Sequence, residues 1–304
     1  MPAYLRLIVL GIALLAFAAC GGASTPTATP APPTATSVPP SQAAATEPAA
    51  TEVPVTASTA TEPAVETAAP AIEVVTVGID PAFEPFVFVQ DGKLAGFDVD
   101  LLNAMAAAGD FEVAYVVSSF DEILSGLQSG KYDAAISAIT VTDERKLLVD
   151  FTPPYFESGK APVSFYNPGQ GIAIRTDNTT ITGVESLTEG VRLGVKTGTT
   201  GATFAAENTT AELVEFPASP AAIEALAAGD LDAVIVDIPV IVGYIKSNPA
   251  AGIRIMGGPV TEEVYAIAVG KEKPAVLALL DAALVEVQDS GAYDQIYNHW
   301  FGTP

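Results

Sequence analysis

The segment ISAITVTDERK, residues Ile136–Lys146, begins with an apolar, strand-like run and ends in a cluster of charges. Thr142 is a residue type that caps helix N-termini, so a helix is predicted to begin directly after it. The free N–H groups and positive dipole end of such a helix favour an anion, and Arg145 one turn in can hold a carboxylate with two parallel hydrogen bonds. The residues alone leave a second interpretation open, in which Arg145 pairs with Glu144 or Asp150.

Three more polar positions follow strand-like runs. The stretch GVKTGTTG places Lys196 and Thr200 in a hydroxyl-rich turn into a predicted helix, which also offers backbone donors to an anion. The stretch has no Gly-Lys-Ser/Thr after a four-residue spacer, so it is not a P-loop. Asp80 follows VTVGI and Asp237 ends AVIVD. A carboxylate at the end of a buried strand needs a cation or several donors. Asp237 is therefore either a counter-charge for a ligand ammonium group or a helix cap before Pro239.

Aromatic residues accompany two of these positions. GIDPAFEPFVF places Phe83 and Phe86 shortly after Asp80, and SSFDEIL contains Phe120. One of the first two rings is expected to line a pocket and the other to fill the core. For Phe120 both roles stay open, because core packing is the usual role of a single aromatic side chain.

The elements that must position these residues alternate between strand-like and helix-like runs from Ala71 onward, which predicts a doubly wound, parallel α/β architecture. One pattern occurs twice. LQSGKYDAAISAI at 127–139 and LAAGDLDAVIVDI at 226–238 share Leu-x-x-Gly-x-x-Asp-Ala-x-Ile-x-x-Ile. The repeat predicts two similar lobes. Ligands of open α/β sheets bind at the carboxyl ends of the strands, where the polar positions described above lie.

The composition excludes several kinds of function. The chain has 304 residues and a formal net charge of −23, from 13 basic and 36 acidic residues, which argues against nucleic acid as a partner. Cys20 and His299 are the only cysteine and histidine. An internal disulfide, a Cys/His metal site and a Ser-His catalytic pair are therefore excluded, and neither a metal nor a cofactor is expected.

The N-terminal segment has the features of an export signal. Arg6 precedes an apolar run from Leu7 to Ala19, which suits a signal peptide at 1–19 and is shorter than the roughly 20 residues of a spanning helix. The residues before Cys20 resemble a bacterial lipobox, which implies cleavage there and acylation of the thiol. Ordinary secretory cleavage is the alternative. Residues 20–70 are rich in Ala, Thr and Pro, and predict a disordered stalk.

Six segments in order resemble one known family. They are GIDPAFEPFVF, GKLAGFDVDLLNAM, LQSGKYDAAISAITVTDERKLLVDFTPPYFESG, LGVKTGTTG, LDAVIVDIP and SGAYDQIYNHWFG. They are similar to the polar amino-acid-binding lipoproteins of bacterial ABC importers, the family-3 extracellular solute-binding proteins, with glutamine-binding protein as a near relative. The resemblance implies the type II periplasmic binding protein fold: two doubly wound lobes, a two-strand hinge and a ligand cleft between the lobes. Lobe 1 would comprise 71–160 and 264–304, and lobe 2 would comprise 161–263. The chain would cross between them near Ser158–Lys160 and Glu263–Ala266.

The same resemblance implies three groups of ligand contacts. The contacts expected for the ligand carboxylate are Arg145 and the N–H groups of Thr140 and Thr200. Those expected for the ligand ammonium group are Asp237, the Thr140 hydroxyl and the carbonyls of Ser137 and Ala138. Those expected for the ligand side chain are the rings of Phe83 and Phe120 and, as in glutamine binders, the charges of Asp80 and Lys196.

Two departures from the family pattern bear on the ligand and the hinge. Val236 stands where glutamine binders tend to carry a polar residue, and KAPVSFYNPGQ at 160–170 lengthens the first crossing. The predicted protein is a non-enzymatic, extracytoplasmic monomer, tethered to the membrane by lipid. It closes on a polar amino acid, with glutamine-like ligands favoured, and delivers it to an ABC permease. The alternatives are a periplasmic dehydratase on the same fold and a ligand-sensing subunit of a receptor.

Overall fold

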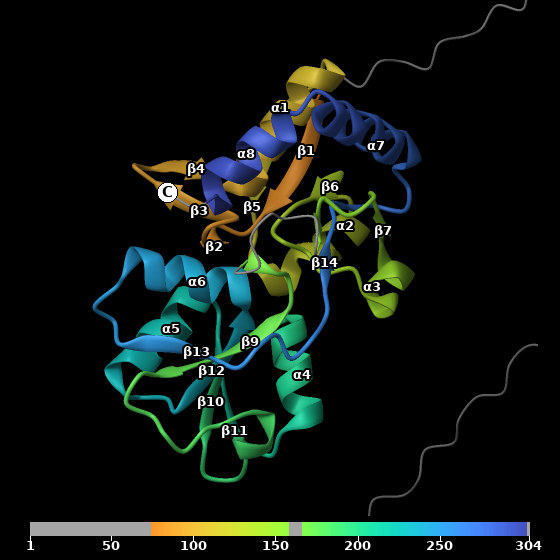
Figure 1. Cartoon of the computed structure of the whole chain (residues 1–304). Helices are drawn as coiled ribbons and strands as arrows, with labels where there is room; N and C mark the ends of the chain where they lie inside the picture. Colours follow the sequence, from red (N-terminus) through yellow and green to blue (C-terminus); the bar gives the residue numbers. More distant parts are fainter. Residues whose placement is uncertain (1–73, 158–165, 303–304) are drawn as a thin grey trace, which may run out of the picture. The chain divides into compact units, whose positions relative to one another are not determined.

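The computed structural model describes residues 74–157 and 166–302 (Figure 1). The predicted signal peptide at 1–19, the acylation site Cys20, the stalk at 20–70 and the first crossing at Ser158–Lys160 lie outside the described residues. None of the helices within the two described ranges is long and apolar enough to cross a membrane.

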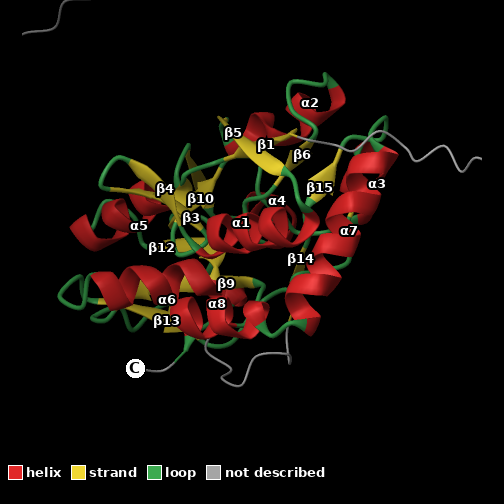
Figure 2. Ribbon diagram, turned by 90° about the horizontal axis from the view of Figure 1, so that it is seen from above, coloured by secondary structure: helices red, strands yellow, loops and turns green. Residues whose placement is uncertain are grey.

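The first of two five-stranded sheets has the order β5-β1-β6-β15-β7. Its strands are β1 (Val74–Ile79), β5 (Glu112–Val117), β6 (Ala134–Ala135), β7 (Asp150–Phe151) and β15 (Ala268–Val269). β1 pairs in parallel with both β5 and β6, whereas β15 is antiparallel to β6 and β7. The associated helices are η1 (Phe120–Glu122), α1 (Phe97–Gly109), α2 (Ile123–Gln128), α3 (Asp143–Leu148), α7 (Pro274–Asp289) and α8 (Ala292–Phe301). α1, α7 and α8 contact one another (Figure 2). We call this group the first lobe.

The second sheet has the order β11-β10-β12-β9-β13. Its strands are β9 (Gln170–Arg175), β10 (Arg192–Lys196), β11 (Glu212–Phe216), β12 (Ala233–Asp237) and β13 (Ile253–Met256). β10 pairs in parallel with β11 and β12, and β9 is antiparallel to β12 and β13. The associated helices are η3 (Val184–Ser186), α4 (Thr200–Asn208), α5 (Ser219–Ala228) and α6 (Ile238–Ser247). We call this group the second lobe.

The predicted parallel arrangement holds for all but one strand of each sheet, and that one strand runs against the others. β9 and β15 come next in the chain after the two segments that pass between the lobes, and each enters its sheet from the opposite end. The repeated pattern nevertheless marks equivalent strands. β6 lies between parallel β1 and antiparallel β15, as β12 lies between parallel β10 and antiparallel β9.

Two short strands connect the lobes. β8 (Phe156–Glu157) pairs antiparallel with β14 (Val264–Tyr265), so that Phe156 lies beside Tyr265. The remaining strands form a small antiparallel sheet of β2 (Ala82–Phe83), β3 (Val87–Gln90) and β4 (Lys93–Ala95). The paired strands β8 and β14 are the described part of the expected two-strand hinge.

An aromatic cluster packs against these connecting strands. The Phe86 ring lies edge-on to Phe156 and Tyr265, at centroid distances of 5.1 and 5.5 Å, and Phe156 stacks on Tyr265 at 5.6 Å. Phe301 from α8 lies 5.1 Å from Phe156. Phe86 therefore lies at the centre of the aromatic cluster, whereas Phe83, which is also buried in the core, lies at its edge, 6.1 Å from Phe86.

Candidate functional site

The carboxyl ends of parallel strands from both lobes meet in one place. Asp80 directly follows β1, and Lys196 ends β10. The Lys196 ammonium group is paired with the Asp80 carboxylate, and both side chains are buried. Asp80 follows a strand of the first lobe and Lys196 ends a strand of the second, so the ion pair joins the two lobes.

Two aromatic rings lie beside this ion pair. The Lys196 Nζ atom is 5.2 Å from the centroid of Phe83 and 5.1 Å from that of Phe120, within the range of cation–π attraction. The Ala82 N–H donates to Asp80 Oδ1 at 3.2 Å, which fixes the carboxylate from its own loop. All four residues expected to contact the ligand side chain thus come together, but Asp80 and Lys196 contact each other directly.

Arg145 is buried on α3 and points toward the second lobe. The N-cap expected at Thr142 is present, because its hydroxyl accepts a hydrogen bond from the Arg145 N–H at 3.2 Å. The guanidinium donates through Nη1 to the Thr140 carbonyl at 2.9 Å and through Nη2 to the Gly198 carbonyl at 3.3 Å. Asp150, a surface partner considered from sequence, pairs with Lys271 at 3.0 Å instead. Burial lowers the pKa of the Arg145 guanidinium from its ordinary value, partly offset by nearby carboxylates.

Asp237 is a buried carboxyl group at the end of β12. Its Oδ1 atom accepts a hydrogen bond from the Tyr265 hydroxyl at 2.6 Å. It occupies the N-cap position of α6, yet its side chain makes no capping hydrogen bond there. Burial and the nearby Glu263 together raise the pKa of Asp237 to about 7, against the opposing effect of hydrogen bonds from Tyr265 and Gln170. A cation placed beside Asp237 would favour its charged form.

Two buried residues that sequence reasoning missed complete this polar cluster. Glu263 accepts hydrogen bonds from the Thr140 hydroxyl at 2.7 Å, from Gln170 Nε2 at 3.2 Å and from the Thr261 hydroxyl at 3.2 Å. Gln170 Nε2 also donates to the Thr200 hydroxyl at 3.2 Å. Glu263 precedes the hinge strand β14 by one residue, and Gln170 ends the segment that sequence comparison marked as an insertion. The one sequence signal for either residue was that Glu263 is a charged residue within the predicted second crossing between the lobes.

The Thr140 and Ser137 side chains link this cluster to the Asp80 side of the site. Thr140 donates its hydroxyl proton to Glu263, which leaves its oxygen lone pairs available to another donor. The Ser137 hydroxyl accepts a hydrogen bond from the Asp80 N–H at 2.9 Å. Ala138 lies between them with a positive φ of 46°. The segment from Ser137 to Thr140 therefore lies between Asp80 on one side and Glu263 on the other.

A pocket of about 500 Å³ opens next to Arg145. Both lobes and the segment before β14 contribute to its lining, which includes Thr140, Thr142, Glu144, Arg145, Gly198, Thr200, Thr203, Glu207, Thr261 and Glu263. The first turn of α4 supplies free backbone N–H groups at Thr200. Within the described residues, no group of three or more His, Cys, Asp or Glu side chains is arranged to hold a metal ion.

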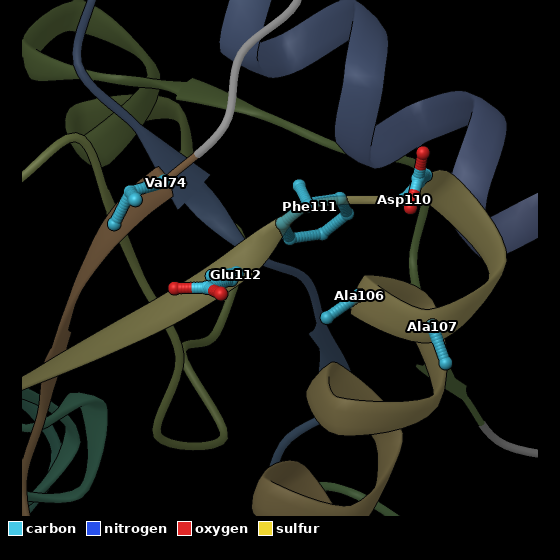
Figure 3. A pocket seen from close by; sticks show the side chains of 6 residues that line it. All are labelled: Val74, Ala106, Ala107, Asp110, Phe111 and Glu112. Carbon is cyan, nitrogen blue, oxygen red and sulfur yellow. The ribbon is translucent and has the colours of Figure 1, made fainter.

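Another pocket, of about 470 Å³, lies at the opposite end of the first sheet (Figure 3). Its lining includes Val74 and Glu112 at the starts of β1 and β5, and Asp110 just after α1. The charged side chains there are acidic and largely exposed. The lining of the pocket beside Arg145 includes the buried, oppositely charged Arg145 and Glu263. We take this pocket, together with the buried charges of Asp80, Lys196 and Asp237 that lie outside its lining, as the candidate ligand site.

Comparison with known proteins places the chain among bacterial extracellular solute-binding proteins. A family model described as "Bacterial extracellular solute-binding proteins, family 3" matches residues 75–303. The "Probable histidine-binding protein" of Neisseria gonorrhoeae is 36% identical over 244 residues, covering 78% of this chain and 87% of the relative.

Two solved structures of an ancestral arginine-binding protein, one bound to arginine and one to glutamine, are each 37% identical to this chain. They cover 76% of it with TM-scores of 0.69 and 0.67, and the match spans 100% and 98% of their own chains. These similarities confirm the expected fold of two α/β lobes with a ligand cleft between them.

Proposed function

Because the chain belongs to the family-3 bacterial extracellular solute-binding proteins, we propose that it captures a polar amino acid for an ABC importer. The observation that carries this proposal is the pair of buried, opposite charges at the candidate site. Arg145 comes from the first lobe and Asp237 from the second, and the nearby Asp237 carboxylate acts to raise the pKa of the Arg145 guanidinium, against the lowering caused by burial. An amino acid carries a carboxylate and an ammonium group, and so complements both.

The carboxylate end of the ligand is assigned to Arg145. Its guanidinium already donates to two backbone carbonyls, which use two of its five N–H donors without neutralising its charge and leave the others for a ligand. A ligand carboxylate can accept two parallel hydrogen bonds from the same group, and charge-assisted bonds are roughly twice as strong as neutral ones. The N–H groups of Thr140 and Thr200 would complete the contacts. Thr200 stands at the first turn of α4, where backbone donors are free.

The ammonium end is assigned to Asp237, the Thr140 hydroxyl and the carbonyls of Ser137 and Ala138. Asp237 is held in place by Tyr265, and the neighbouring Glu263 adds negative charge to the same region. A buried carboxylate of raised pKa gains most from a cation that is itself removed from water. A compact ammonium group with three N–H donors can bond several of these oxygens together.

The ligand side chain is assigned to the region of Asp80, Lys196, Phe83 and Phe120. Because Asp80 and Lys196 already balance each other's charge, a neutral amide fits better than a second cation. A glutamine amide offers N–H donors to Asp80 and a carbonyl acceptor to Lys196. A cationic side chain would lie close to the Lys196 ammonium group. We therefore favour a glutamine-like ligand, although relatives that bind histidine and arginine are known.

Calorimetric titration of the purified chain with glutamine, histidine and arginine tests this assignment. Glutamine is expected to bind most tightly and to give the largest rise in melting temperature, since a ligand that binds only the native state stabilises it. Tighter binding of arginine would overturn the choice of side chain. Absence of binding by all twenty amino acids would overturn the proposal itself, and turnover of prephenate or arogenate would favour the dehydratase alternative.

Delivery to the permease would depend on closure of the two lobes about β8 and β14. The proposed rigid bodies are residues 71–160 with 264–304, and residues 161–263. A ligand that contacts Arg145 and Asp237 together favours the closed arrangement, because only that arrangement makes both contacts. We further propose that the chain acts as a monomer and is anchored through acylated Cys20. Mass spectrometry of the membrane fraction tests the acylation, and C20A is expected to release the protein.

A further inference from the structure

Asp98 is a fully buried carboxyl group outside the charged clusters described above. It lies in the first turn of α1 in the first lobe. Its Oδ2 atom accepts a hydrogen bond from the Ala138 N–H at 2.8 Å. Burial raises the pKa of the Asp98 carboxyl to about 7, and the bond from Ala138 opposes the rise. Because burial of a carboxyl group is costly, a polar residue at this position calls for a specific role.

The backbone of Ala138 is in the left-handed region, with a φ of 46°. Asp91 and Asp110 are the other non-glycine residues with positive φ in the described ranges. Aspartate tolerates this conformation because its short polar side chain can hydrogen-bond locally, whereas alanine has no such group. The left-handed conformation at Ala138 therefore depends on support from elsewhere, and the Asp98 carboxylate bonds directly to the strained peptide.

The bend at Ala138 determines where the chain goes next. Before it, the Ile136 N–H still bonds to the Gly78 carbonyl of β1 at 3.1 Å. After it, Ile139 accepts a hydrogen bond from the Ala266 N–H at 3.1 Å, and Thr140 forms a bridge with Tyr265 of β14. The segment thus passes from the sheet of the first lobe to the hinge strand within four residues.

This path places the segment's polar groups in the candidate site. The Thr140 carbonyl reaches Arg145 Nη1 and its hydroxyl reaches Glu263. The Ser137 hydroxyl reaches the backbone of Asp80 on the other side. A change in φ at Ala138 would swing the carbonyls of Ser137 and Ala138 away from these neighbours.

We infer that Asp98 is a positioning residue of the amino-acid site: its carboxylate holds Ala138 in the left-handed conformation and so aims the 137–140 segment at the ligand ammonium group. The inference rests on the proposed function, because it assigns Asp98 a role in the same site. Asp98 does not contact the ligand in this account and acts only through the backbone of Ala138.

A double-mutant cycle tests the inference, with D98A, A138G and the combined variant compared with the wild-type chain. Affinity is measured by calorimetry at pH 8 for whichever of glutamine, histidine and arginine the wild type binds most tightly. D98A is expected to bind about tenfold more weakly, because an unsupported alanine leaves the left-handed region. A138G is the reference for the combined variant, because glycine adopts positive φ freely and keeps the backbone carbonyl at this position.

The decisive variant is D98A combined with A138G. It is expected to recover affinity to within about threefold of A138G, because glycine no longer needs the carboxylate to hold its conformation. A role of Asp98 in folding alone would lower the melting temperature without this selective rescue. The inference is overturned if the combined variant binds as weakly as D98A, or if D98A binds like wild type.

Amide hydrogen exchange of Ala138 provides a readout that does not depend on the ligand. If D98A does not fold, D98N is used in its place, with an expected loss of affinity of about threefold and faster exchange at Ala138, because a neutral acceptor bonds more weakly. Unchanged exchange together with unchanged affinity would contradict the inference. Failure of the wild type to bind any of the three amino acids would count against the proposed function, and exchange at Ala138 would still test the contact with Asp98.

Discussion

The two lobes share one sheet topology but differ at the ends of equivalent strands. β1, β5 and β6 correspond to β10, β11 and β12, and each triplet is followed in its sheet by an antiparallel strand. After β12 the chain enters α6 directly, which leaves the Asp237 side chain at the site. After β6 it bends at Ala138 and pairs with the hinge strand before α3 begins. The end of β12 in the second lobe thus presents the Asp237 side chain to the site. The end of the equivalent strand β6 in the first lobe presents mainly backbone groups.

The charges at the site divide between the lobes in a complementary way. The first lobe supplies Asp80 and Arg145, and the second supplies Lys196 and Asp237. Asp80 and Lys196 pair with each other across the lobes, whereas Arg145 bonds to carbonyl groups and Asp237 to a hydroxyl group. One pair of opposite charges therefore joins the lobes directly, and the proposed amino-acid ligand would engage the other pair.

Removal of Asp237 should have the largest effect on this division of charge. D237A deprives the ligand ammonium group of its ion partner, and loss of one member of a buried pair costs about 3–5 kcal/mol. Binding measured by calorimetry should therefore fall by at least a hundredfold. The matched control is D177A in the same lobe, where the carboxylate is exposed and pairs with Arg175 at 3.5 Å. Wild-type affinity in D237A would show that the charge is not used.

Arg145 should show the next largest effect. R145K keeps the charge but loses the planar fork that a carboxylate accepts, with an expected cost of about 2 kcal/mol in binding free energy. K146R changes the neighbouring residue, whose exposed ammonium group pairs with Asp143 at 3.0 Å, and should leave affinity within about twofold. Equal effects of both substitutions would mean that Arg145 does not grip a carboxylate.

Breaking the ion pair between Asp80 and Lys196 should change the preference of the site between glutamine and arginine. K196M removes the cation that balances Asp80, so the preference between glutamine and arginine should shift toward arginine by about tenfold. Competition calorimetry with the two amino acids measures the ratio. K271M, which breaks the partly exposed pair with Asp150, serves as the control and should leave the ratio unchanged. A ratio that does not move in K196M would place the ligand side chain elsewhere.

The smallest expected effect is on the pH dependence of binding. The pKa of Asp237 is raised to about 7 by burial, and Glu263, Arg145, Tyr265 and Gln170 face the carboxyl group. A ligand ammonium group requires the ionised form, so affinity should fall as pH falls through about 7. The stability of the protein alone changes in the opposite sense. The protonated carboxyl of raised pKa contributes stability below its unfolded pKa, and this contribution is lost as pH rises through about 7.

Y265F separates Asp237 from other groups that titrate in this range, such as Asp98. Loss of the hydrogen bond from the Tyr265 hydroxyl should raise the pKa of Asp237 further and move the midpoint of the affinity profile to higher pH. Calorimetric affinities between pH 5 and 9 give the midpoint for both proteins. Identical midpoints would assign the titration to another group.

Local features of the chain could be predicted because they depend on neighbours in sequence. The cap at Thr142, the strands before Asp80 and Asp237, and the helix after Thr199 all follow from hydrogen bonds or side-chain patterns within a few residues. The repeated pattern at 127–139 and 226–238 likewise marked the two equivalent strands. The acidic composition argued against nucleic acid as a partner. The single cysteine and single histidine excluded an internal disulfide, a Cys/His metal site and a Ser-His catalytic pair.

Contacts between distant segments could be decided only by the tertiary structure. Phe83 and Phe86 have the same residue type and similar surroundings in sequence, and both are buried in the core. Only the tertiary structure packs Phe86 against Phe156 and Tyr265 and places Phe83 beside the Lys196 ammonium group. The antiparallel strands β9 and β15 depend on how the chain re-enters each sheet after the hinge, which local periodicity does not encode.

The sequence by itself determined the α/β class, the repeated strands and which charged residues stand at strand ends, because strand periodicity and helix capping act over a few residues. The tertiary structure alone decided that Asp80 pairs with Lys196, that Glu263 and Gln170 join the site, and that Asp98 supports Ala138. These contacts join residues at least 40 positions apart. They depend on the bend after β6 and the pairing of β14, and burial then sets how strongly each charge interacts.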